Sequence, residues 1–139
     1  MDEKNLRIMS IRELRIFKNE MGKKGIKVVV DSKGRIFKEY KAPQNVAAMF
    51  LSDTDRIVLR PSPRILDALH ESYHAKHMLE VGKKLYEPIT RSVREEFVYE
   101  TIMKNKHLFT DAEIYEAQRY IEFVRTGDWP APDWKGYGK

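Results

Sequence analysis

Residues 70–74 read His-Glu-Ser-Tyr-His, the pattern H-E-x-x-H, whose histidines and glutamate can do chemistry together. On an α-helix, residues four apart share a face with Cβ atoms ~5–6 Å apart, so His70 and His74 can bind one metal ion. Glu71 lies about 100° around the helix, where its carboxylate flanks the ion as a general base. The spacing therefore predicts a hydrolase with Zn²⁺ as its cofactor.

The flanking residues predict a helix that turns these histidines inward. Ser62 and Pro63 supply an N-cap and a first-turn proline, Gly82 supplies a stop, and residues 66–79 contain no helix breaker. On a helical wheel the histidines share a face with Leu66. Imidazoles on a buried face need partners, and a metal ion fits this spacing. A structural or solvated histidine pair is the alternative.

A catalytic zinc site normally has a third protein ligand, which we sought in the helix predicted over about 88–106. Projected at about 100° per residue, its apolar stripe contains Glu96 and Glu100, whereas Glu95 falls outside it. A carboxylate on a buried face costs free energy unless it is paired or bound to metal. We therefore expect Glu96 as the third ligand and Glu100 as its neighbour. Glu95 is the alternative ligand, and pairing with Lys or Arg is the structural explanation.

Four more side chains near the motif are candidates for supporting roles. Tyr73 and Tyr99 are candidate donors to the charge that develops during hydrolysis, with packing as the alternative for each. Asp67, one turn before His70, either orients that imidazole or forms a surface salt bridge. His77 follows on the metal-facing side, where it either hydrogen-bonds the substrate or packs.

Composition bounds the fold and the partners. A chain of 139 residues with 42% apolar residues predicts one domain over residues 1–139, and the absence of cysteine leaves His and carboxylates as metal ligands. The net charge is +5, but basic and acidic residues alternate, so we expect no nucleic-acid partner. No apolar run approaches the ~20 residues of a membrane span, and the N-terminus lacks a signal-peptide core. We expect a soluble protein without a membrane partner.

The hydrophobic pattern predicts an α+β fold. An N-terminal helix precedes a small three- to four-stranded antiparallel or mixed sheet, and three helices follow, including the H-E-x-x-H helix. The first and last helices open with capping boxes at Ser10-x-x-Glu13 and Thr110-x-x-Glu113. The expected helices are 10–21, 66–79, about 88–106 and 111–126, and the expected strands are 26–30, 35–40, 46–51 and 57–59.

Three further segments complete the predicted organisation. Residues 26–40 read as a hairpin around the turn Asp31–Gly34, and the edge near residues 47–51 could pair with an extended peptide. Residues 1–9 are expected to be flexible. Residues 128–139 are expected to form an irregular tail, because glycine and proline interrupt them.

With these residues identified, the chain resembles the zincin-like metallopeptidase toxin domains at the C-termini of bacterial polymorphic toxins. The resemblance rests on residues 69–74 and on Arg94-Glu95-Glu96-Phe97-Val98-Tyr99, and it covers about residues 25–125. It implies a minimal zincin-like fold and a gluzincin-like endopeptidase acting on a protein or peptide. It further implies secretion within a larger protein, action in the target cell and neutralisation by a cognate immunity protein.

Residue by residue, the resemblance implies that His70 and His74 bind zinc, Glu71 is the base and Glu96 is the downstream glutamate. His77 stands where metzincins have glycine, which disfavours a third histidine ligand. Two alternatives remain open. One is a cytoplasmic regulatory zincin that cleaves a repressor, and the other is a catalytically inactive zincin that acts as a binding module.

Overall fold

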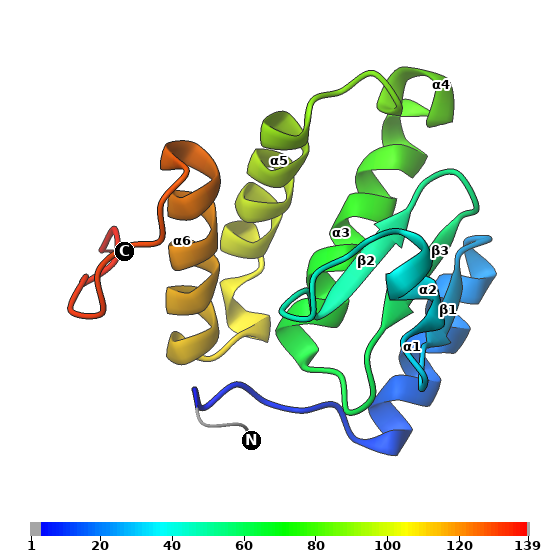
Figure 1. Ribbon diagram of the computed structural model, residues 1–139, viewed down its shortest axis with the longest axis horizontal. Helices are drawn as coiled ribbons and strands as arrows, with labels where there is room; N and C mark the ends of the chain where they lie inside the picture. The colour runs from blue at the N-terminus through cyan, green and yellow to red at the C-terminus, as the bar shows by residue number, and fades with distance from the viewer. Residues whose placement is uncertain (1–3, 139) are drawn as a thin grey trace.

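The protein folds as helix α1, a small sheet and a group of helices (Figure 1), which confirms the α+β prediction. The computed structural model describes residues 4–138. The elements are α1 (Ile11–Lys23), β1 (Lys27–Val30), α2 (Arg35–Glu39), β2 (Ala48–Leu51), β3 (Arg56–Leu59), α3 (Ile65–Val81), α4 (Lys83–Tyr86), α5 (Arg91–Lys104), the 3₁₀-helix η1 (Lys106–Leu108) and α6 (Asp111–Thr126).

The sheet has three strands in the order β1-β3-β2, with β1 parallel and β2 antiparallel to β3. Because side chains alternate along a strand, β3 serves two cores. Ile57 and Leu59 pack with Phe17 of α1 and Met78 of α3, while Val58 packs on the other side with Phe37 of α2. In this strand order β2 lies at one edge of the sheet, and α3 packs against it.

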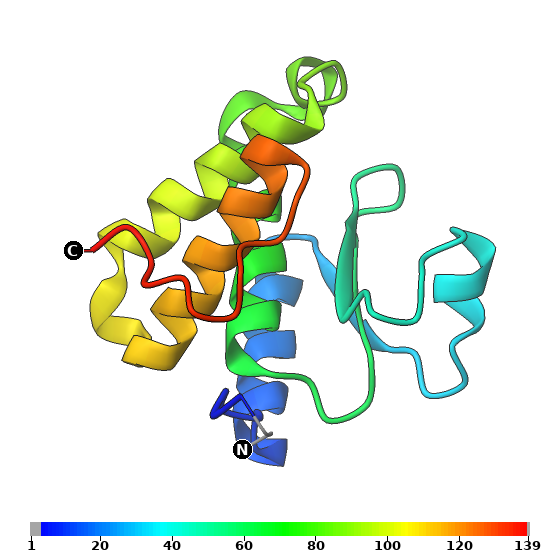
Figure 2. The ribbon, with the colours of Figure 1, turned by 60° about the vertical axis from the view of Figure 1, so that its left-hand side comes forward.

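Helices α3, α5 and α6 form the other half of the molecule (Figure 2). α5 packs between α3 and α6, and a second hydrophobic cluster joins the three helices. Its buried members are Leu66, Tyr73, Val98, Ile102 and Ala117. This cluster fixes how α5 is rotated against α3, and that rotation decides which side chains of α5 meet the histidines.

The predicted hairpin over residues 26–40 is wrong in its second half, where Arg35–Glu39 forms α2. Both carboxylate oxygens of Asp31 accept hydrogen bonds from backbone N–H groups, at 3.1 Å from Arg35, 2.9 Å from Ile36 and 3.1 Å from Phe37. These are the donors that a first helical turn leaves unpaired. Gly34, with φ 70°, provides the left-handed entry.

The two predicted capping boxes are confirmed at Ser10 and Thr110, and Gly82 ends α3. Other boundaries move. α3 begins at Ile65 after Arg64, so Ser62 is not its cap, and α5 begins at Arg91, later than expected from Pro88. The short helix α4 occupies what was expected to be a connection.

Residues 4–9 contact the rest of the chain; the flexibility of residues 1–9 stays a prediction, and residues 1–3 lie outside the described part. Leu6 is buried, and Ile8 forms an antiparallel β-bridge with Arg64. Arg7 donates to Glu113 of α6 through its backbone and its guanidinium. This N-terminal segment therefore connects the start of α3 to α6.

Residues 128–138 contain no helix or strand and lie against α6. The Trp129 ring stacks on Phe123 at 4.5 Å, and the Tyr115 hydroxyl donates to the backbone oxygen of Trp134. Within residues 4–138, none of the helices combines the length and apolar character that a membrane span requires.

Candidate metal centre

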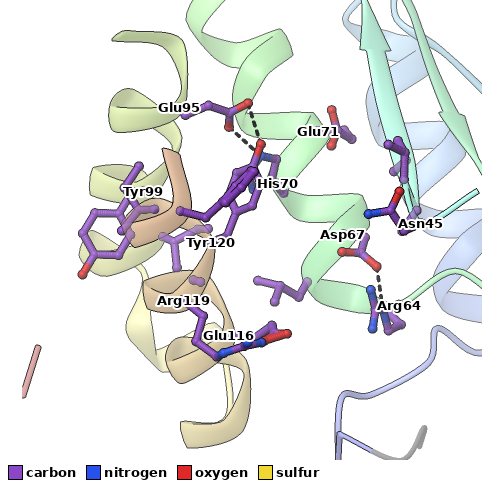
Figure 3. Close-up of a pocket in the computed structure, with 18 of the residues that line it drawn as sticks. Asn45, Arg64, Asp67, His70, Glu71, Glu95, Tyr99, Glu116, Arg119 and Tyr120 are labelled. Atoms are coloured by element: carbon purple, nitrogen blue, oxygen red, sulfur yellow. Dashed lines mark hydrogen bonds and ion pairs between the residues drawn. The ribbon is translucent and has the colours of Figure 1, made fainter. Parts of the chain in front are cut away.

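Three side chains from two helices meet around one carboxylate oxygen, and Figure 3 shows two of them, His70 and Glu95. The Oε1 oxygen of Glu95 lies 2.9 Å from His70 Nε2 and 3.1 Å from His74 Nε2. The potential ligand atoms of these three residues all lie within 4.8 Å of one another. Among residues 4–138 this is the one group of three or more such side chains close enough to hold a metal ion.

Helix geometry explains why the histidines converge. His70 and His74 are one turn apart on α3, and their rings lie 5.0 Å apart at 67°. α5 runs beside α3 and supplies Glu95, which is only 8% exposed. A buried carboxylate needs partners, and the two imidazoles supply them to its Oε1 oxygen.

The prediction that Glu96 is the third member of this group is corrected by the structure. Glu96 lies on the outer side of α5, where both its oxygens pair with Arg125 at 2.7 and 2.8 Å. The buried residues of α5 are Glu95, Val98, Thr101 and Ile102, whereas the apolar Val93 on the same helix is 54% exposed. Because Glu95 and Thr101 are polar, a search for apolar side chains alone does not identify this buried face.

The chemistry and spacing of this group fit a bound divalent metal ion. Two histidines and a glutamate are a known ligand set of catalytic zinc sites, which keep a fourth position open. Ligand atoms ~2.0–2.1 Å from a tetrahedral ion lie ~3.3 Å from one another. The observed separations of 2.9 and 3.1 Å are slightly shorter, because hydrogen bonds now draw the atoms together.

Charge and burial at the group oppose each other. Burial favours the neutral acid of Glu95, but its hydrogen bonds with His70 and His74 outweigh burial and hold the pKa of Glu95 well below its usual range. Burial disfavours the His70 cation, yet its hydrogen bond with Glu95 and the nearby carboxylates raise the pKa of His70 to about 9. Burial raises the pKa of Glu71, partly offset by the two histidines.

The group opens into a cleft of about 540 Å³, whose walls come from the edge of β2 and from α3, α5 and α6. Glu71 lines this cleft together with His70 and Glu95 (Figure 3). On the strand side the lining includes Ala47 and Ala48. The cleft therefore runs between the start of β2 on one side and His70 and Glu95 on the other.

Three of the predicted supporting residues lie away from the cleft. Glu100 is exposed on α5, which corrects its expected place beside the ligands. His77 is buried, with its ring stacked on Phe97 at 4.0 Å and edge-on to Tyr86 at 5.3 Å. Tyr73 is buried in the second hydrophobic cluster. His77 and Tyr73 thus take the packing alternative.

The other two supporting candidates do line the cleft. Asp67 forms an ion pair with Arg64 at 2.6 Å, the salt-bridge alternative foreseen for it. Tyr99 faces the cleft and has the Arg125 guanidinium 5.4 Å from its ring centre. The role of Tyr99 as a donor stays a prediction.

Arg91, Tyr120 and Trp129 are among the cleft residues that sequence reasoning missed. The Tyr120 hydroxyl donates to Glu95 Oε2 at 3.2 Å, and Arg91 donates to the same hydroxyl at 3.2 Å. Tyr120 is three residues after the buried Ala117, which was the one available signal that it faces inward. Trp129 lies in the tail, where no periodicity exists to place it.

A comparison with known families agrees with this geometry. The family model described as metallopeptidase toxin 4 matches residues 1–127. The chain belongs to the metallopeptidase toxin 4 family. Membership confirms the resemblance drawn from H-E-x-x-H and identifies the chain as a metallopeptidase toxin domain. No curated protein and no solved structure matches the chain.

Proposed function

We propose that this metallopeptidase toxin domain is a zinc-dependent endopeptidase that hydrolyses a peptide bond within a protein substrate. The observation that carries the proposal is the meeting of His70, His74 and Glu95 beside a cleft that His70, Glu95 and Glu71 line. Two helices carry these four groups, and metal-assisted peptide hydrolysis uses three ligands and one base of this kind.

His70, His74 and Glu95 would hold the ion, with Glu95 in the role first assigned to Glu96. Nitrogen and carboxylate ligands without a thiolate suit zinc, and the chain has no cysteine. When bound, zinc polarises the scissile carbonyl and lowers the pKa of a water molecule toward 7.

Glu71 is the proposed general base. Its carboxylate follows His70 directly in the sequence and faces the same cleft, so it can take the proton of the attacking water. The same oxygen can then deliver that proton to the leaving amine, which departs as a neutral group. Because Glu71 is not one of the three clustered residues, its substitution should spare metal binding.

An extended chain is the substrate conformation that the cleft suits. β2 is an edge strand of the sheet, and its first residue, Ala48, lines the cleft together with the preceding Ala47. A strand edge offers N–H and C=O groups to a peptide that runs alongside it. A chain bound in this way extends past the cleavage point on both sides, which favours an endopeptidase over an enzyme that trims chain ends.

Family membership supports a biological role as a toxin. We propose that the domain is delivered as part of a larger secreted protein, acts on a protein of the target cell and is neutralised in the producer by a cognate immunity protein. Expression in a bacterial host tests the toxic role. Growth arrest that Glu71→Gln relieves supports a toxin, whereas normal growth together with cleavage in vitro favours a regulatory protease.

The direct test combines metal content with cleavage of a peptide library prepared from a bacterial lysate and read by mass spectrometry. We expect about one zinc per chain, lost in both His70→Ala and His74→Ala. Glu71→Gln should retain zinc and lose cleavage. Zinc binding without cleavage in the unaltered chain would favour an inactive binding module, and absence of zinc would reject the proposal.

A further inference from the structure

A continuous line of hydrogen bonds runs from an exposed residue to the metal centre. Arg91, at the first position of α5, donates to the Tyr120 hydroxyl, and that hydroxyl donates to Glu95 Oε2, both at 3.2 Å. Glu95 Oε1 faces the two imidazoles. The carboxylate therefore uses its two oxygens for two different purposes.

The direction of this line is fixed by chemistry. A guanidinium only donates hydrogen bonds, and an ionised carboxylate only accepts them. The hydroxyl between them must accept from Arg91 and direct its one hydrogen at Glu95. The edge-on contact between the Tyr120 and His70 rings, 5.4 Å apart at 79°, holds the tyrosine in place.

This arrangement matters because a carboxylate can bind a metal through one oxygen or through both. A second oxygen would fill the position that a catalytic site keeps open. We propose that Tyr120 is a positioning residue that keeps Glu95 Oε2 away from the ion, so that Glu95 binds through Oε1 alone. Arg91 acts one step further out by orienting the hydroxyl. The inference rests on the proposed metal site.

Cobalt(II) is the probe, because its visible absorption per ion falls when the coordination number rises above four. In the unaltered chain we expect the intense bands of a low-coordinate ion. In Tyr120→Phe the freed oxygen should enter the coordination sphere and weaken those bands. We also expect Co²⁺ affinity to fall roughly 10- to 100-fold, as for other outer partners of metal ligands.

Tyr115→Phe is the matched control. It removes a hydroxyl from the same helix that donates to the backbone oxygen of Trp134 rather than to Glu95. Its thermal unfolding should resemble that of Tyr120→Phe in the metal-free state, while its Co²⁺ spectrum should equal that of the unaltered chain. A change of the same size in Tyr115→Phe would overturn the inference.

The spectrum decides between the outcomes. An unchanged Co²⁺ spectrum in folded Tyr120→Phe overturns the role of Tyr120 and leaves the metal site intact. Failure of the unaltered chain to bind Co²⁺ or Zn²⁺ instead rejects the proposed function itself. Should Tyr120→Phe not fold, Arg91→Gln at an exposed position replaces it, with a weaker change in the same direction expected and an unchanged spectrum counting against the inference.

Discussion

Glu95 and Glu96 are adjacent on α5, yet they lie in opposite environments. Glu95 faces α3, is buried and has two imidazoles and a tyrosine hydroxyl as partners. Glu96 faces outward, and both its oxygens pair with the guanidinium of Arg125. An arginine stays charged, so its ion pair with a carboxylate persists. An imidazole can instead lose its proton and bind a metal ion through the freed lone pair. The kind of partner, more than burial, separates a structural carboxylate from a metal ligand.

The inner and outer faces of α5 should differ most in how much their glutamates contribute to metal affinity. Glu95→Gln should weaken zinc binding roughly 100- to 1,000-fold, because one ligand accounts for about a quarter of the ~10–16 kcal/mol of a four-ligand site. Glu96→Gln, the matched control, should leave affinity unchanged. Competition with a chromophoric chelator measures both. Equal effects of the two substitutions would contradict the assignment of Glu95.

Glu113 sharpens the comparison, because it combines the burial of Glu95 with the arginine partner of Glu96. It is 0% exposed and accepts three hydrogen bonds from Arg7. Arg7→Met should lower the free energy of unfolding by about 2–3 kcal/mol, since it leaves a buried charge without its cation. Urea unfolding measures this.

Lys4→Met is the control for Arg7→Met. Lys4 pairs with Glu116 on the same helix, but its side chain is 55% exposed. Exposed pairs contribute ~0–1 kcal/mol, so this change should be small. An Arg7→Met effect as small as that of Lys4→Met would show that water replaces the guanidinium at no cost.

A third difference concerns protons in the metal-free protein. Burial disfavours the His70 cation, but its hydrogen bond with Glu95 and the carboxylates around it raise the pKa of His70 to about 9. The charged imidazole therefore stabilises the fold fully below the ordinary pKa of histidine, and this contribution disappears as pH rises through about 9. In Glu95→Gln the His70 pKa should fall by more than about one unit, equivalent to ~1.4 kcal/mol, and in Glu96→Gln it should not move. NMR titration of the imidazole protons follows this. If the His70 pKa were the same in Glu95→Gln and in the unaltered chain, coupling between these two side chains would be excluded.

The smallest effect should come from the outer pair itself. Arg125→Gln removes the partner of Glu96, and both side chains are partly exposed, at 40% and 36%. We expect a loss of at most about 1 kcal/mol, further reduced in 1 M salt because exposed pairs are screened. Thermal unfolding at two salt concentrations measures this. A larger and salt-independent loss would mean that Arg125 also stabilises the chain by packing on Tyr99.

The helix starts and stops that the sequence predicted best depend on contacts within a few residues. Ser10 with Glu13, and Thr110 with Glu113, close their capping boxes inside one turn. α2 was not predicted, although the signal for its start is also only a few residues away. The signal for its start is the side chain of Asp31, which lies before Gly34 and reads as turn chemistry in a linear sequence.

The metal site was only partly predictable, because its members come from different helices. His70 and His74 share one helix, so their separation follows from its pitch. The choice between Glu95 and Glu96 depends on how α5 rotates against α3, which Val98 and Ile102 settle by packing with Leu66. Tyr120 depends on a third helix, so no pattern near the motif points to it.

The contact between Arg7 and Glu113 joins residues 106 positions apart, almost the two ends of the matched region. Closing so long a loop has a high entropic cost, so this contact should form late in folding. A chain that emerges from a ribosome exposes His70, His74 and Glu95 before α6 is complete. The hydrogen bond from Tyr120 to Glu95 therefore cannot form until α6 has been synthesised.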